Sequence, residues 1–215
     1  MFTPEFNIYD QGILLLVGLI AIYLLVRFFN RYGEKKGRYD IYYMVSFAVL
    51  LIAGVLLIIF TYSALDNQLV EIVGVLIPTG LALGLVAQFF EQYEKPFLGF
   101  VLVGLIAIAI TRFAMPGTTL ATITLVIVHA FSGFLILVLP FLAAKQGKTR
   151  NAFVSVSLGG LLIDAGGMAL AFLAIGKQFL FFSGDLVLTI LAPLLLLMVI
   201  AFAYGFTRDF QHQAA

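Results

Sequence analysis

Seven long apolar segments constrain the fold of this chain more than any other feature of its sequence. They cover residues of about 11–29, 41–62, 69–90, 97–113, 119–144, 152–175 and 186–206. An α-helix that crosses the hydrocarbon core of a bilayer needs about 20 mainly apolar residues, and these segments have that length. We therefore expect an all-α membrane protein, a single domain over residues 1–215 that folds as a seven-transmembrane-helix bundle.

The composition fits a chain surrounded by lipid. Apolar residues make up 63% of it and charged residues only 11%, whereas about a quarter of the residues in soluble domains are charged. The net charge is +1 and the basic residues are spread over helix ends, so we expect no nucleic-acid partner.

We expect a multi-pass protein of the plasma or inner membrane. Its partners would be the lipid bilayer and either other membrane subunits or further copies of the chain.

The basic residues predict the orientation of the bundle, because Lys and Arg near helix ends stay on the cytoplasmic side. Ten of the twelve fall on one side of the predicted membrane, and this places the N-terminus outside and the C-terminus in the cytoplasm. The ten are Arg27, Arg31, Lys35, Lys36, Arg38, Lys95, Lys145, Lys148, Arg150 and Arg208, and the other two are Arg112 and Lys177.

Of the 23 Asp, Glu, Lys and Arg residues, 22 lie in predicted loops or near helix ends, where water or headgroups can solvate them, and Asp164 is the exception. It lies about 12 residues from either end of segment 152–175. A carboxylate at that depth costs about 2.5 to 3.5 kcal/mol on insertion scales, and such residues tend to mark ion, proton or ligand paths. Gly160 and Gly167 share its helix face, and small residues favour close helix packing. We therefore expect Asp164 to face the bundle interior.

His129 reaches a similar depth in segment 119–144, and Ser132 lies one turn further along the same face. The segments of His129 and Asp164 are consecutive and joined by a short connection, which predicts antiparallel packing. We expect His129 and Asp164 to approach each other, as either a functional pair or a polar contact that fixes helix register. With Ser132 they form the predicted mid-membrane binding site.

Pro78 and Thr79 complete the predicted mid-membrane site. Proline removes one intrahelical hydrogen bond, so we expect a kink in segment 69–90 that exposes backbone groups to a cavity. Nearer the predicted outer end, Glu71, Arg112 and Asp185 suggest a charged entrance. Solvated residues at the membrane boundary are the alternative interpretation of these three.

In size, helix count and orientation the chain resembles microbial rhodopsins. Those proteins bind retinal through a lysine in the seventh helix, and segment 186–206 contains none. Thr189 stands where their pattern would place that lysine. We therefore expect no retinal and transfer no rhodopsin function to this chain.

Other cofactors and enzyme classes are not expected either. A haem with two histidine ligands would need a membrane partner for His129, but the second histidine, His212, lies in the tail. A zinc site needs three or more ligands, and His129 with Asp164 falls short. Ser132 has no recognisable nucleophile elbow or oxyanion donor around it. We expect no enzyme, no metal and no cofactor.

Two functions agree with these features. The first is a membrane protein that binds or translocates a small solute or a proton through the mid-membrane polar site. The alternative is a non-catalytic integral subunit or small sensor module of a larger membrane complex. Transport requires a hydrated cavity that reaches the polar site from at least one side, whereas the alternative requires only surfaces for a partner.

Overall fold

The computed structural model describes residues 7–213, and the side chains up to Phe210, so the side chain of His212 lies outside the described part. Within this range the regular elements are helices, apart from one isolated β-bridge between Phe179 and Phe182. Seven spans are long and apolar enough to cross a membrane, which confirms the predicted all-α bundle. The α-helices are α1 (Ile8–Lys35), α2 (Arg38–Phe60), α3 (Gln68–Gly74), α4 (Leu76–Phe89), α5 (Glu94–Ala114), α6 (Thr119–Lys145), α7 (Ser155–Leu173) and α8 (Gly184–Gln213).

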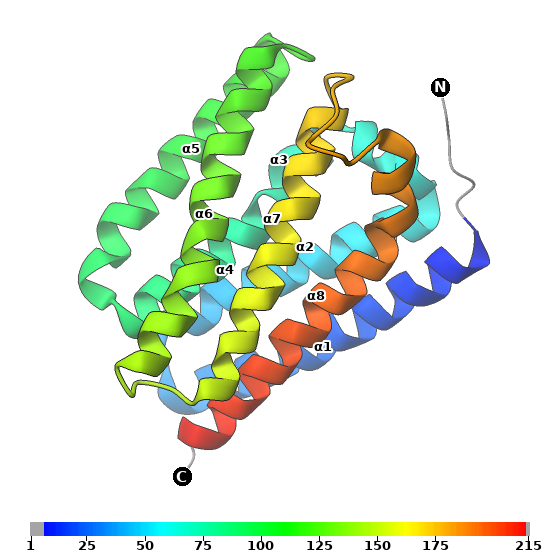
Figure 1. Ribbon diagram of the computed structural model, residues 1–215. Coiled ribbons are helices and arrows are strands. Elements are labelled where there is room, and N and C mark those ends of the chain that lie inside the picture. The colour runs from blue at the N-terminus through cyan, green and yellow to red at the C-terminus, as the bar shows by residue number, and fades with distance from the viewer. Residues whose placement is uncertain (1–6, 214–215) are drawn as a thin grey trace.

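Three short 3₁₀ helices, Thr61–Asp66, Glu91–Tyr93 and Asn151–Val154, lie at the ends of the spans. The connections alternate between the two ends of the bundle (Figure 1). The N-side holds the start of α1 and the connections around residues 61–67, 115–118 and 174–183. The C-side holds the end of α8 and the connections around residues 36–37, 90–93 and 146–154.

Helix α1 is longer than its apolar segment because polar residues cap it at both ends. The side chain of Asn7 accepts hydrogen bonds from the backbone N–H groups of Tyr9 and Asp10, and Asp10 accepts one from Asn7 in return. This capping box starts the helix at Ile8. At the other end Lys36 adopts a left-handed conformation with φ of 53°, which ends the helix.

Residues Gln68–Phe89 form one span, as expected for segment 69–90, and the expected kink in it is a break into two helices. Helix α3 ends at Gly74 and α4 begins at Leu76. Pro78 has no N–H to donate to the carbonyl four residues earlier, which is that of Gly74, so the break lies before the proline. The Thr79 hydroxyl donates to the Val75 carbonyl at 2.8 Å and stabilises the first turn of α4.

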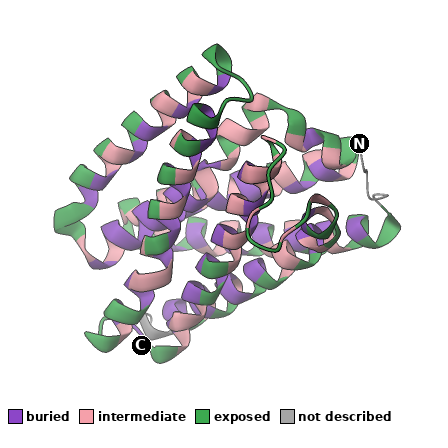
Figure 2. Cartoon of the chain, turned by 45° about the horizontal axis from the view of Figure 1, so that its top comes forward, coloured by how far each residue is buried: buried purple, intermediate pink, exposed green. Residues whose placement is uncertain are grey.

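Helix α4 lies at the centre of the bundle, between α2 and α6, and most of its residues are buried. Around it, α1 packs against α2 and α8, and α7 packs against α6 and α8. Figure 2 shows the buried side of each long helix turned inward and the exposed side turned outward. The outward faces are largely apolar, as a lipid environment requires.

Aromatic side chains fill the C-side half of the bundle. The ring centroid of Phe28 lies 4.8 Å from that of Tyr43 and 5.0 Å from that of Phe206. Phe47 and Phe153 extend the same cluster, and all five side chains are almost fully buried. Rings at these separations pack densely, so this half of the interior is closed.

Candidate functional site

A cavity of about 1320 Å³ occupies the N-side half of the bundle. At its mouth it is lined by Tyr62, Asp66 and Pro116, and its deepest lining residues include His129 and Ile163. Its side walls are mainly apolar residues of α2, α7 and α8. The volume exceeds the range of about 300 to 1,000 Å³ typical of small-molecule sites. Because its lining extends from the N-side connections to His129, the cavity connects the N-side of the bundle with the level of the predicted mid-membrane site.

His129 and Asp164 lie side by side at the deep end of this cavity, as the sequence predicts. His129 Nε2 is 3.8 Å from Asp164 Oδ1 and 3.2 Å from the backbone carbonyl oxygen of Ile163. His129 is 7% exposed and Asp164 9% exposed. The imidazole lines the cavity, whereas Asp164 is not among the lining residues. His129 is therefore the member of the pair that lines the cavity, and Asp164 lies directly beside it.

The Asp164 carboxylate is incompletely satisfied. Its Oδ1 is buried and has no hydrogen-bond partner among the residues that the structure describes. A buried acceptor without a partner costs about 1 to 3 kcal/mol, and more when it is charged. Asp164 Oδ1 therefore has acceptor capacity that the described residues leave unused.

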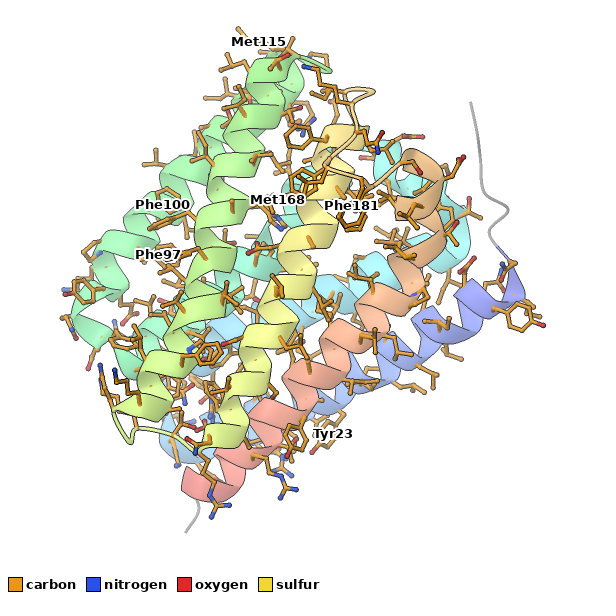
Figure 3. All side chains as sticks on the ribbon, viewed as in Figure 1. Tyr23, Phe97, Phe100, Met115, Met168 and Phe181 are labelled. Carbon is orange, nitrogen blue, oxygen red and sulfur yellow. The ribbon has the colours of Figure 1, made fainter. Side chains whose placement is uncertain are left out.

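Two glycines make room for this pair in a reciprocal arrangement. Gly133 on α6 faces the Asp164 carboxylate, and a Cβ built on Gly133 would overlap it. Gly167 on α7 faces the His129 ring, and a Cβ there would overlap the imidazole. Each helix thus carries one polar side chain and, one turn later, the glycine that accommodates its partner. Met168, the neighbour of Gly167, marks this level of α7 in Figure 3.

Of the other three residues of the predicted mid-membrane site, Pro78 lines the cavity, whereas Thr79 and Ser132 do not. Pro78 lines the cavity together with Gly74 and Val75, so the break between α3 and α4 faces the cavity. Thr79 is buried, bonds to its own helix and does not line the cavity. Ser132 also bonds to its own helix, with its hydroxyl 2.8 Å from the Val128 carbonyl oxygen, and is not a lining residue.

The three predicted entrance residues line the same cavity as His129. Arg112 Nη1 is 3.2 Å from Glu71 Oε2, an ion pair that joins α5 to α3. The Arg112 side chain is only 4% exposed and that of Glu71 19%, whereas Asp185 is exposed at the start of α8. The entrance and the mid-membrane pair are therefore two ends of one cavity, which the sequence does not reveal.

A second group of buried charges lies at the C-side and was missed by the sequence analysis. Arg31 Nε donates to Asp40 Oδ1 at 2.6 Å, and Arg31 Nη1 donates to Asp209 Oδ2 at 3.4 Å. Asp209 also accepts hydrogen bonds from Gln88 at 2.9 Å and from Thr149 at 2.8 Å. We call these five residues the C-side network. It ties α1, α2, α4 and α8 to the connection after α6.

The expectation that Asp164 is the only charged residue away from water is therefore wrong. Arg31 is 6% exposed, and Asp40 and Asp209 are fully buried. Helices α1 and α8 continue beyond their apolar segments, so residues assigned to solvated ends are enclosed by other helix ends. One feature of the sequence could have predicted the C-side network: Arg31 and Asp40 have opposite charges and flank the short connection between the first two spans.

Metal ligands do not cluster in the described part of the chain. Among the side chains that the structure describes, which end at Phe210, no group of three or more His, Asp or Glu is arranged to hold a metal ion. No family model, curated protein or solved structure matches the chain. The function is therefore inferred from the cavity and the groups that line it.

Proposed function

We propose that this protein is an integral membrane protein that binds a small solute or proton in the N-side cavity and moves it across the bilayer past His129 and Asp164. In this proposal the N-side faces the outside and the C-side faces the cytoplasm. The orientation is supported by the basic residues, ten of which belong to the C-side and two to the N-side.

One observation carries the proposal: a single cavity reaches from the N-side to a buried His–Asp pair. Ionisable groups at this depth are costly and tend to mark proton or ion paths. The incompletely satisfied Asp164 carboxylate offers an acceptor that a proton or a solute hydrogen-bond donor would satisfy. His129 lines the cavity with its Nε2 3.8 Å from this carboxylate, and a histidine so placed suits proton exchange between the two.

The closed C-side supports a two-state mechanism. One turn to the C-side of Asp164, Ile136 packs against Gly160 and Phe202 against Gly159, and the C-side network lies further along in the same direction. A transporter that alternates between two open sides has one side closed at any time. Under this proposal the structure corresponds to the state that is open to the N-side.

A one-sided cavity also suits the alternative function, a sensor or binding subunit of a larger membrane complex. Such a protein needs access to its ligand from one side only. The two functions differ in one requirement, since a sensor moves nothing across the membrane. Flux through the purified protein therefore separates them.

Neutralising Asp164 is expected to abolish proton flux. In proteoliposomes with an internal pH-sensitive dye and an imposed potential, we expect the wild type to acidify the lumen faster than protein-free liposomes. Asp164→Asn should return the rate to the protein-free level, because the amide cannot exchange a proton at the end of the cavity. Glu91→Gln is the matched control, since the Glu91 side chain is 78% exposed at the C-side.

Equal rates in the wild type and Asp164→Asn would remove the proposed role of this carboxylate. A wild-type rate no higher than that of protein-free liposomes would remove proton translocation and favour the sensor or subunit. A drop in Glu91→Gln as well would point to a general effect of lost charge.

Cysteine substitution is expected to show that the cavity is wet and open to the outside. The chain has no cysteine, so each introduced thiol is the only one. Leu188 and Leu195 line the cavity, whereas Leu197 is 58% exposed on the outer face of the same helix. The thiolate is the form of cysteine that attacks a thiol reagent, and it forms in water and not in lipid. An impermeant methanethiosulfonate added to intact cells should modify Leu188→Cys and Leu195→Cys much faster than Leu197→Cys. Equal, slow modification of all three would contradict an open cavity.

A further inference from the structure

A groove of about 600 Å³ lies on the outside of the bundle between α1 and α8, apart from the central cavity. Its walls are apolar and aromatic side chains of both helices, and the Tyr23 hydroxyl lies 3.2 Å from the Thr207 hydroxyl across it. Tyr23 is on the outward side of α1 toward the C-side end (Figure 3). The lining residues are Leu16, Leu19, Ile20, Tyr23, Ile200, Ala203, Tyr204, Thr207 and Arg208.

The groove runs along the helices and not across them. Helices α1 and α8 both run from the N-side to the C-side, and the contact of Tyr23 with Thr207 fixes their relative register. The same register places Leu16 beside Ile200, seven residues earlier on each helix. Seven residues of helix span about 10 Å. The groove is therefore a shallow, elongated apolar depression that runs along the two helices.

Positive charge is concentrated at the C-side end of this groove. Arg208 lines it, and its guanidinium lies 5.5 Å from the ring centroid of Tyr204. Arg27 is one turn beyond Tyr23 on α1, with its guanidinium 5.1 Å from the Phe210 ring centroid. The adjacent carboxylate, Asp209, is fully buried and belongs to the C-side network.

We propose that this groove is a binding site for one anionic phospholipid. An acyl chain lies in the apolar depression between Leu16 and Ile200, and the phosphate lies between Arg27 and Arg208. Basic pockets between transmembrane helices recognise anionic lipid headgroups in this way. The Tyr204 ring, which lines the groove, stabilises the Arg208 guanidinium, and the Phe210 ring stabilises that of Arg27 in the same way.

The charge distribution selects a lipid over a second copy of the chain. A symmetric dimer through this groove would place the arginines of one copy against the same arginines of the other, and like charges across an interface are unfavourable. A lipid supplies the apolar tail and the negative headgroup in one molecule. This inference does not depend on the proposed function, because the groove and the central cavity share no lining residue.

The test uses the absence of tryptophan from the chain. In Ile200→Trp the only indole lies in the groove, and its fluorescence is quenched by lipids that carry bromine on the acyl chain. The protein is reconstituted in phosphatidylcholine with increasing amounts of brominated phosphatidylglycerol or brominated phosphatidylcholine. We expect phosphatidylglycerol to bind at this position about fivefold more strongly or better, since one cation near a membrane surface contributes about 1 kcal/mol.

Two controls make the test specific. Val103→Trp places the indole on α5, where Val103 is 68% exposed and lies outside the groove, and should show no comparable preference. Ile200→Trp combined with Arg27→Gln and Arg208→Gln should lose the preference while quenching by both lipids persists. Leu16→Trp is the second reporter at the same level if the first variant does not elute as a folded protein.

Equal quenching by the two lipids in Ile200→Trp and in Leu16→Trp would overturn the proposal, because the groove would then hold any lipid. Absence of quenching by either lipid would also overturn it and would indicate that protein covers the groove. A preference that persists without the two arginines would show that they do not bind the headgroup.

Discussion

Replacing Arg31 with methionine is expected to destabilise the protein by about 3 to 5 kcal/mol, because removal of one partner from a buried ion pair leaves an uncompensated charge. Here two carboxylates, Asp40 and Asp209, are fully buried beside this guanidinium. Methionine fills much of the same volume, so the loss reflects charge more than packing. Thermal unfolding in detergent, followed by circular dichroism or by the surviving monodisperse fraction, measures the effect.

Arg38→Met is the matched control for this prediction. The Arg38 side chain is 61% exposed, so water screens its ion pair with the buried Glu94 at 3.2 Å. Glu94 also keeps a hydrogen bond from the Tyr42 hydroxyl at 2.9 Å when Arg38 is lost, so we expect Arg38→Met to be less destabilising than Arg31→Met. Adding Asp40→Asn and Asp209→Asn to Arg31→Met should restore much of the stability, because the buried charges are then gone together. If Arg31→Met and Arg38→Met unfold at the same temperature, the C-side network does not stabilise the fold.

Gly133→Ala is expected to destabilise the protein by about 1 to 3 kcal/mol, the usual effect of overpacking a well-packed interior. The added methyl group would occupy the position of the Asp164 carboxylate, so either the helices separate or Asp164 moves away from His129. Proton flux in proteoliposomes should fall in parallel with thermal stability. Gly167→Ala should act in the same way through the His129 ring.

Gly99→Ala tests whether the effect is local. A Cβ on Gly99 would meet nothing within 4 Å, and alanine favours a helix more than glycine by about 1 kcal/mol, so this variant should be as stable as the wild type or more so. Gly133→Ala with Asp164→Ala should be less destabilised than the sum of the single changes, since the methyl group then has space. Strict additivity would show that Gly133 and Asp164 do not interact.

The sequence was sufficient for the features that depend on local pattern. Apolar length predicted seven spans, and the short connection between two of them predicted that His129 and Asp164 lie close together. Both follow from helix geometry along one or two neighbouring elements. Their role in binding stays a prediction, because proximity alone does not distinguish a functional pair from a structural one.

The cavity and the C-side network depend on how distant helices tilt and pack, which no periodicity records. Glu71, Arg112 and His129 come from three different helices, and only the arrangement of those helices makes them line one space. Arg31 and Asp209 are 178 positions apart in the chain. A hydropathy pattern also treats 69–90 as one span, since the lost hydrogen bond before Pro78 leaves the apolar character unchanged.

The break between α3 and α4 gives the mouth of the cavity a mechanical property of its own. The hydrogen-bond ladder is already interrupted at Gly74 and Val75, so a change in the angle between the two helices breaks no further intrahelical bond. The seven-residue helix α3 is therefore able to change its angle to α4 at the break, and the residues of the break, Gly74 and Val75, line the cavity. The ion pair of Glu71 with Arg112 ties the middle of α3 to α5, and together with the packing of Ile72 against the cluster around Ile108 it resists this movement.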